Sequence, residues 1–187
     1  MGILVSCNQF TTGNNPSSET NTPAAETSTE NVEGETIAEI ELITTPDKIE
    51  EALKSPEALK NIQETELFYT NREFSPAWTE ADTRTSFYEA LKKADEEGLF
   101  FNDYHGKILS DLLQRSTELN AAEIASLDVL LTDAFLSYAH DLYYGKIDPK
   151  ELYENWGVSR KQQDLEKLLQ EGIANKNVTE ILEQLKP

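Results

Sequence analysis

Residues 121–144 read AAEIASLDVLLTDAFLSYAHDLYY, and their apolar side chains recur at steps of three and four positions. The apolar stripe comprises Ile124, Leu127, Leu131, Ala134, Phe135, Tyr138 and Leu142, while Glu123, Asp133, Ser137 and Asp141 fall off it. This period predicts an amphipathic α-helix. Leu130 and Leu136 widen the apolar face, so the helix should be central. Asn120 is placed to cap its start and Gly145 to end it.

Shorter segments with the same helical period surround this stretch. One predicted helix starts at Thr79 or Asp82, passes through Phe87, Leu91 and Ala94, and stops at Gly98; a second opens at Asp103 and contains Tyr104, Ile108, Leu109, Leu112 and Leu113. Three further helices are expected: Lys150–Tyr153, which follows Asp148-Pro149, then Gln163–Ile173, and a last short helix that contains Val178, Ile181, Leu182 and Leu185. Asn177 precedes the last helix and is better explained as its cap than as a glycosylation sequon.

No segment alternates convincingly enough to predict a sheet, although Glu39–Thr44 is compatible with one edge strand. The sequence therefore predicts an all-α fold, in which residues 48–187 form one bundle-like domain of about six helices.

The chain is strongly acidic, with a formal net charge of -19, and the imbalance is greatest near its start. Residues 8–47 contain acidic side chains but no Lys or Arg, and residues 8–36 are mostly Asn, Thr, Ser, Glu, Pro, Gly and Ala. Such a composition buries too little apolar surface to offset the entropy of ordering. We expect residues 8–47 to be a disordered acidic tether. The charge also argues against nucleic-acid partners, which require clustered cations.

Cys7 is the single cysteine and His105 and His140 are the two histidines, so the sequence predicts no disulfide, no metal site and no cofactor. Leu4-Val5-Ser6-Cys7 has the form of a bacterial lipobox, in which the thiol after a small residue receives diacylglycerol. This interpretation makes residues 1–7 the remnant of a signal peptide and Cys7 the lipidation site. Two alternatives stay open: an accidental cysteine, and myristoylation at Gly2 within Met1-Gly2-Ile3-Leu4-Val5-Ser6, with Cys7 palmitoylated in a eukaryotic cytoplasmic protein.

Four stretches of the sequence share their order and spacing with a known family. They are LFYTNREFSPAW (67–78), GL (98–99) with DYH (103–105), LDVLLTDAF (127–135) and GKIDP (145–149). Over Leu67–Trp156 the chain resembles the helical scaffold domain of the large murein L,D-transpeptidases, which cross-link bacterial peptidoglycan. In that family the scaffold precedes a peptidoglycan-binding insertion and a catalytic domain with a Ser-His-Gly-Cys signature. This sequence has no match to the signature, and its end, Leu185-Lys186-Pro187, is similar to the family's junction before the next helical segment.

The resemblance implies a non-catalytic module of the cell envelope, anchored through lipidated Cys7 and facing the periplasm. A transpeptidase needs a thiolate beside a histidine, whereas Cys7 lies at the far end of the predicted tether, where no histidine is held in a fixed position beside it. The expected partners are the membrane and the catalytic and peptidoglycan-binding domains of an L,D-transpeptidase, or another envelope protein. The chain would then be a truncated or excised piece of such an enzyme. The alternative is a stand-alone periplasmic lipoprotein adaptor.

No catalytic residue is predicted. His140 is expected at the surface or its boundary, His105 in a packing or capping role, Trp78 as a core anchor, and Arg72 paired with an acidic helix face. Asp128 and Asp133, five positions apart, do not share a helix face well enough for acid and base roles.

Overall fold

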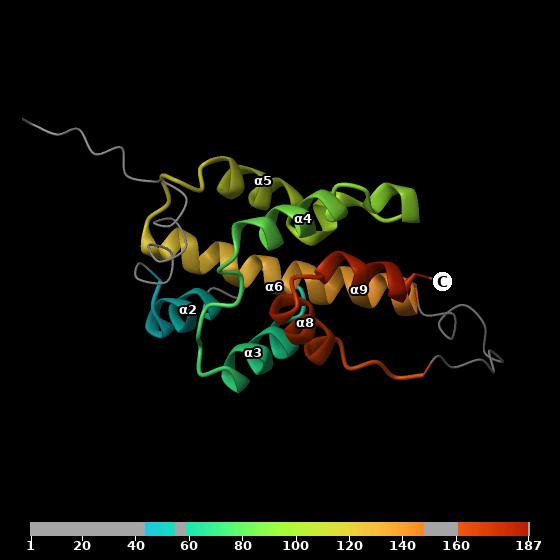
Figure 1. The fold of residues 1–187 in the computed structure, drawn as a ribbon, viewed down its shortest axis with the longest axis horizontal. Coiled ribbons are helices and arrows are strands. Elements are labelled where there is room, and N and C mark those ends of the chain that lie inside the picture. The colour runs from blue at the N-terminus through green and yellow to red at the C-terminus, as the bar shows by residue number, and fades with distance from the viewer. Residues whose placement is uncertain (1–43, 55–58, 148–160, 187) are drawn as a thin grey trace, which may run out of the picture. The chain divides into compact units, whose positions relative to one another are not determined.

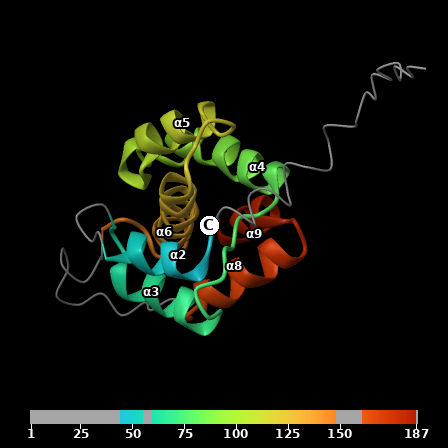
Figure 2. The same ribbon diagram turned by 90° about the vertical axis from the view of Figure 1, so that its left-hand side faces the viewer.

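One long helix, α6 (Ala121–Tyr144), forms the centre of the fold, as its apolar pattern predicts. The computed structural model describes residues 44–54, 59–147 and 161–186, all within one compact unit, Val32–Pro187. Helix α6 packs against α2, α3, α5, α8 and α9. Figure 2 looks along α6 and shows these helices arranged around it.

The described residues contain seven α-helices and no strand, which confirms the all-α fold. Besides α6, the elements are α2 (Pro46–Leu53), α3 (Ile62–Asn71), α4 (Ala81–Leu91), η2 (Ala94–Glu97), η3 (Phe101–Tyr104), α5 (Gly106–Gln114), α8 (Leu165–Ala174) and α9 (Val178–Leu185), shown in Figure 1. The expected helix at 150–153 lies outside the described residues, as does the candidate edge strand except for Thr44. Pro46 and Asp47, which the sequence placed in the tether, form the first turn of α2.

Several predicted helix starts are wrong, and the differences have local causes. Helix α4 begins after Glu80, without a side-chain cap from Thr79 or Asp82, and it ends at Leu91. The chain then makes the separate 3-10 turn η2 before Gly98, whose φ is 72°. Residues 101–104 form a second 3-10 turn, and His105 has a φ of 58°, so α5 begins at Gly106 instead of Asp103.

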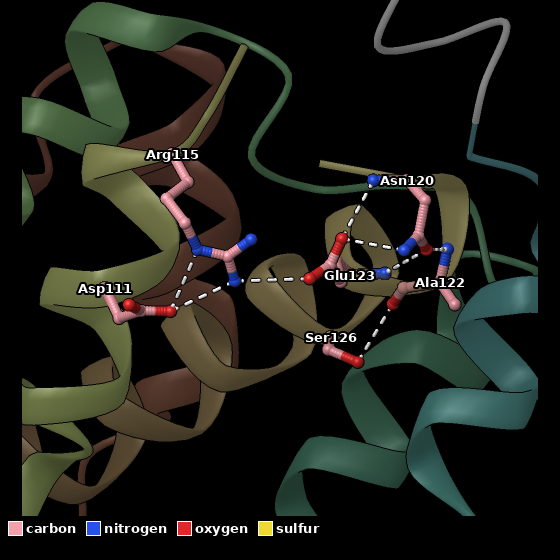
Figure 3. A network of polar contacts seen from close by, with 6 residues as sticks. All are labelled: Asp111, Arg115, Asn120, Ala122, Glu123 and Ser126. Carbon is pink, nitrogen blue, oxygen red and sulfur yellow. Dashed lines mark hydrogen bonds and ion pairs between the residues drawn. The ribbon is translucent and has the colours of Figure 1, made fainter. Parts of the chain in front are cut away.

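A capping box fixes the start of α6, as Figure 3 shows. The Asn120 side chain accepts hydrogen bonds from the amides of Ala122 (3.0 Å) and Glu123 (3.2 Å), and the Glu123 carboxylate accepts the Asn120 amide at 3.0 Å. Arg115 at the end of α5 bridges Asp111 (3.0 Å) and Glu123 (3.2 Å). These contacts satisfy the free amides at the start of the helix and fix its connection to α5.

The core is built on aromatic rings that pack against α6. Trp78 is 1% exposed, which confirms it as a core anchor. Its ring lies 5.1 Å from that of Phe87, which in turn lies 5.7 Å from Phe135 of α6. Among the described residues, no helix has both the length and the hydropathy needed to cross a membrane.

Candidate functional site

Asp128, in the buried middle of α6, holds the loop between α3 and α4. Its carboxylate accepts hydrogen bonds from the amides of Ala77 (2.9 Å) and Trp78 (2.8 Å) and from the Tyr69 hydroxyl (2.5 Å). The Thr132 hydroxyl, one turn further along α6, lies 2.9 Å from the Tyr69 hydroxyl and accepts the Trp78 indole N–H at 3.0 Å. One face of α6 therefore binds the polar groups of the loop directly.

Two arginines hold the carbonyl groups of the same loop. Arg72 donates to the carbonyls of Ser75 (2.9 Å) and Pro76 (2.8 Å). Arg84 donates to the carbonyls of Trp78 (2.5 Å) and Thr79 (2.9 Å). Arg72 is structural, as predicted, but its partners are backbone carbonyls and not an acidic helix face.

Burial dominates the electrostatics around Asp128. It raises the pKa of Asp128, although the hydrogen bonds from Tyr69, Ala77 and Trp78 oppose the change. Burial, followed by the neighbouring Asp128 charge, also raises the pKa of Tyr69 well above its ordinary value. The phenol therefore stays protonated and keeps donating to the carboxylate. This arrangement stabilises the contact between α6 and the loop.

Asp133, which falls off the predicted apolar stripe, forms a second buried polar centre. Its carboxylate accepts the amides of Lys60 (3.0 Å) and Asn61 (2.8 Å) and the Thr65 hydroxyl (3.2 Å). Nε2 of His105 lies 2.6 Å away, and the side chains of His105 and Asp133 are 9% and 0% exposed. Burial raises the pKa of Asp133, but the hydrogen bonds from His105 and from the two amides lower it by more, so the net pKa lies below the ordinary value.

Three residues that the sequence singled out, His105, Asp128 and Asp133, lie in these two buried polar centres. His105 has a packing role, one of the two expected for it, because its buried ring contacts Asp133; its side chain makes no capping hydrogen bond at the start of α5. Asp128 and Asp133 have separate sets of partners, which agrees with their predicted lack of a shared face. Their burial does not follow from the apolar pattern of the helix. An aspartate inside the apolar run of a central helix was the available signal, because a buried carboxylate requires donors.

His140 lies near the exposed end of α6, as predicted, with 53% of its side chain exposed. Its Nδ1 lies 3.2 Å from Asp141, and Asp141 also accepts the Tyr104 hydroxyl at 2.8 Å. The contact with Asp141 raises the pKa of His140, against the opposing effect of burial. The His140 ring packs against Tyr144, with centroids 5.0 Å apart.

His140 and Tyr144 form one wall of a hollow of about 820 Å³. The other walls come from Glu64 of α3 and from residues 162–166 at the start of α8. The amide of Gln163 donates to the Tyr144 hydroxyl at 2.8 Å and so fixes this segment against α6. The volume falls within the usual range for small-ligand sites, about 300–1,000 Å³. Its carboxylates, amides and imidazole can bind a polar ligand by hydrogen bonds.

The predicted lipidation site, Cys7, lies outside the described residues. Within the described part of the chain, no group of three or more His, Cys, Asp or Glu side chains is arranged to hold a metal ion.

The family model of the Scaffold domain matches residues 63–187. The chain belongs to the Scaffold domain family. No curated protein and no solved structure matches the chain. The Scaffold domain begins within α3 and includes both aspartates of α6 and every residue of the loop that Asp128 holds. Helix α2 precedes the matched residues, yet it packs on α6.

Proposed function

We propose that this Scaffold domain protein is a non-catalytic module of the bacterial cell envelope that supports and positions an L,D-transpeptidase. The observation that carries the proposal is that the stretches which resemble the transpeptidase scaffold contact one another in the folded chain. Tyr69, Ala77 and Trp78 of the first stretch contact Asp128 of the third, and His105 of the second contacts Asp133 of the third. These residues hold one part of the fold to another, which suits a domain that works by shape.

The proposed anchor is a diacylglycerol group on Cys7, with the helical domain facing the periplasm and residues 8–43, before the described helices begin, as the spacer. The composition of that spacer, rich in Thr, Ser and Glu and free of Lys and Arg, supports this part of the proposal. Intact mass of the protein expressed with its native upstream region tests it. We expect the mass increment of a lipidated cysteine in the wild type and none in Cys7→Ser; an unmodified wild-type Cys7 would contradict the anchor.

The proposed partners are the catalytic and peptidoglycan-binding domains of an L,D-transpeptidase. The alternative is a stand-alone adaptor that binds another envelope protein through the same helices. The gene sequence beyond Pro187 separates the two. An open frame with a Ser-His-Gly-Cys stretch favours a piece of a transpeptidase, whereas a stop codon favours the adaptor.

Titration calorimetry of the full chain with a separately produced L,D-transpeptidase catalytic domain tests the partner directly. We expect a saturable complex of one chain with one catalytic domain. An unrelated helical protein of similar negative charge serves as the control for non-specific attraction. If the control binds as tightly as this chain, or if neither binds, the proposed support role is wrong.

A further inference from the structure

The hollow of about 820 Å³ beside His140 brings three distant parts of the chain together. Asn61 and Glu64 line it from the start of α3, His140 and Tyr144 from the end of α6, and residues 162–166 from the start of α8. Figure 1 and Figure 2 both show α3 and α8 next to each other. A ligand in this hollow would contact all three segments at once, so their side chains decide its chemistry.

The carboxylates of Glu64, Asp164 and Glu166 converge on this hollow. Burial, followed by the charges of Asp164 and Glu64, raises the pKa of Glu166. Asp141 and, to a smaller extent, Glu64 raise the pKa of His140 against the effect of burial. Because a charge shifts a pKa in this way only over a short distance, Glu64 lies near both Glu166 and the imidazole.

No cation in the described part of the chain neutralises these carboxylates. The described lining of the hollow contains no Lys or Arg, and neither Glu64 nor Glu166 forms an ion pair with a described Lys or Arg. Lys167 follows Glu166 in the sequence, but it lies 3.8 Å from Glu171 and does not line this hollow. The pKa of Glu166 is accordingly raised, whereas a neighbouring cation would lower it. The hollow therefore favours a positively charged ligand.

Aromatic rings form the wall of the hollow at the end of α6. The rings of His140 and Tyr144 have centroids 5.0 Å apart and are inclined at 41° to each other. Asp141, 3.2 Å from Nδ1 of His140, balances the charge of the imidazole when it is protonated. A planar cation that binds carboxylates can also stack on such rings, as a guanidinium group does.

The combination of carboxylates and rings favours a guanidinium group over other cations. The described side chains of the hollow are not arranged to hold a metal ion. An ammonium group is a compact and strongly hydrated charge, whereas a guanidinium group presents five donors in one plane and can reach two carboxylates at once. The hollow is larger than one side chain needs, and the side-chain amides of Gln162 and Gln163 can pair with main-chain groups of a ligand. An arginine within a polypeptide has this chemistry.

We propose that this hollow binds an arginine side chain of a partner polypeptide, with the guanidinium group between Glu64 and Glu166 and its plane against the rings of His140 and Tyr144. The net charge of -19 attracts such a partner at longer range. The proposal depends on the lining of the hollow and not on the envelope role, so either can fail alone.

The test is an NMR titration of the isotope-labelled full chain with blocked pentapeptides of alanine that carry arginine, citrulline or lysine at the centre. Citrulline has the shape of arginine without its charge. We expect saturable binding of the arginine peptide, weaker binding of the lysine peptide, and an affinity about tenfold lower for the citrulline peptide, equal to one lost charge contact. Free arginine should also bind more weakly than the arginine peptide, because Glu64 and Glu166 repel its own carboxylate.

Two variants locate the binding in this hollow. Glu64→Gln and Glu166→Gln should each lower the affinity for the arginine peptide by about tenfold and leave that for the citrulline peptide unchanged. Glu66→Gln is the matched control, because Glu66 is an exposed carboxylate of α3 that does not line the hollow. It should bind all the peptides as the wild type does. Circular dichroism of each variant checks that the fold is kept.

Several results would overturn the proposal. One is the absence of saturable binding of the arginine peptide by the folded wild type, and another is equal binding of the arginine peptide and either the citrulline or the lysine peptide. Tighter binding of free arginine than of the arginine peptide would exclude a polypeptide ligand. An equal loss of affinity in Glu66→Gln and Glu166→Gln would mean that the net charge of the chain, and not the hollow, attracts the peptide.

Discussion

Replacing Asp128 with alanine removes the acceptor for three buried donors at once. The Ala77 and Trp78 amides and the Tyr69 hydroxyl would lose contacts of 2.9, 2.8 and 2.5 Å. Each buried donor left without a partner costs about 1–3 kcal/mol. Part of this loss is offset, because the variant no longer buries a carboxylate whose pKa is raised by burial. We expect Asp128→Ala to lower the free energy of unfolding by about 3–5 kcal/mol.

Urea unfolding of the full chain, followed by circular dichroism, measures this change. Asp111→Ala is the matched control, because Asp111 is 66% exposed and forms only a surface ion pair with Arg115; its cost should stay below about 1 kcal/mol. Tyr69→Phe removes one of the three donors, and should cost about 1 kcal/mol. A loss in Asp128→Ala no larger than in Asp111→Ala would refute the reasoning, because it would mean that the loop between α3 and α4 does not depend on the carboxylate.

Three further changes test other parts of the fold. Gly106→Ala should destabilise the protein by about 1–3 kcal/mol in urea unfolding, because a Cβ there would meet the Phe101 ring; a neutral result would show that the ring moves freely. Gly172→Ala, whose Cβ would lie 2.9 Å from Cδ1 of Ile181, should lower the melting temperature by separating α8 from α9, and an unchanged melting temperature would contradict this close packing. The pKa of Asp133 is lowered in the folded state, so the stability that its carboxylate contributes is present above about pH 4 and is lost as the pH falls through the folded pKa. Between pH 5 and pH 2 the melting temperature should therefore fall more steeply for the wild type than for Asp133→Asn. Parallel curves of melting temperature against pH would exclude this effect.

The central helix could be predicted because its signals are local. The apolar period, the Asn120 cap and the Gly145 end all lie within or beside α6. The all-α fold, the burial of Trp78 and the exposure of His140 follow from patterns of the same kind. These features depend on neighbours in the sequence, and such neighbours are visible without a structure.

The polar interior could not be predicted in the same way. Periodicity assigns Asp133 to the surface, but its donors come from residues 60–65 and from His105, far away in the sequence. The 3-10 turn before His105 delays the start of one expected helix from Asp103 to Gly106, because the left-handed residue His105 interrupts the helical backbone. The hollow beside His140 depends on how α3, the end of α6 and residues 162–166 come together, and no local pattern reports that.

The claim that this Scaffold domain protein acts by contact and not by bond-making is tested most directly by an exchange assay. The purified full chain is incubated with a donor tetrapeptide and an acceptor amine, and the products are followed by mass spectrometry. We predict no exchange product above the buffer level for either the wild type or Cys7→Ser. Exchange by the wild type that Cys7→Ser abolishes would contradict the account.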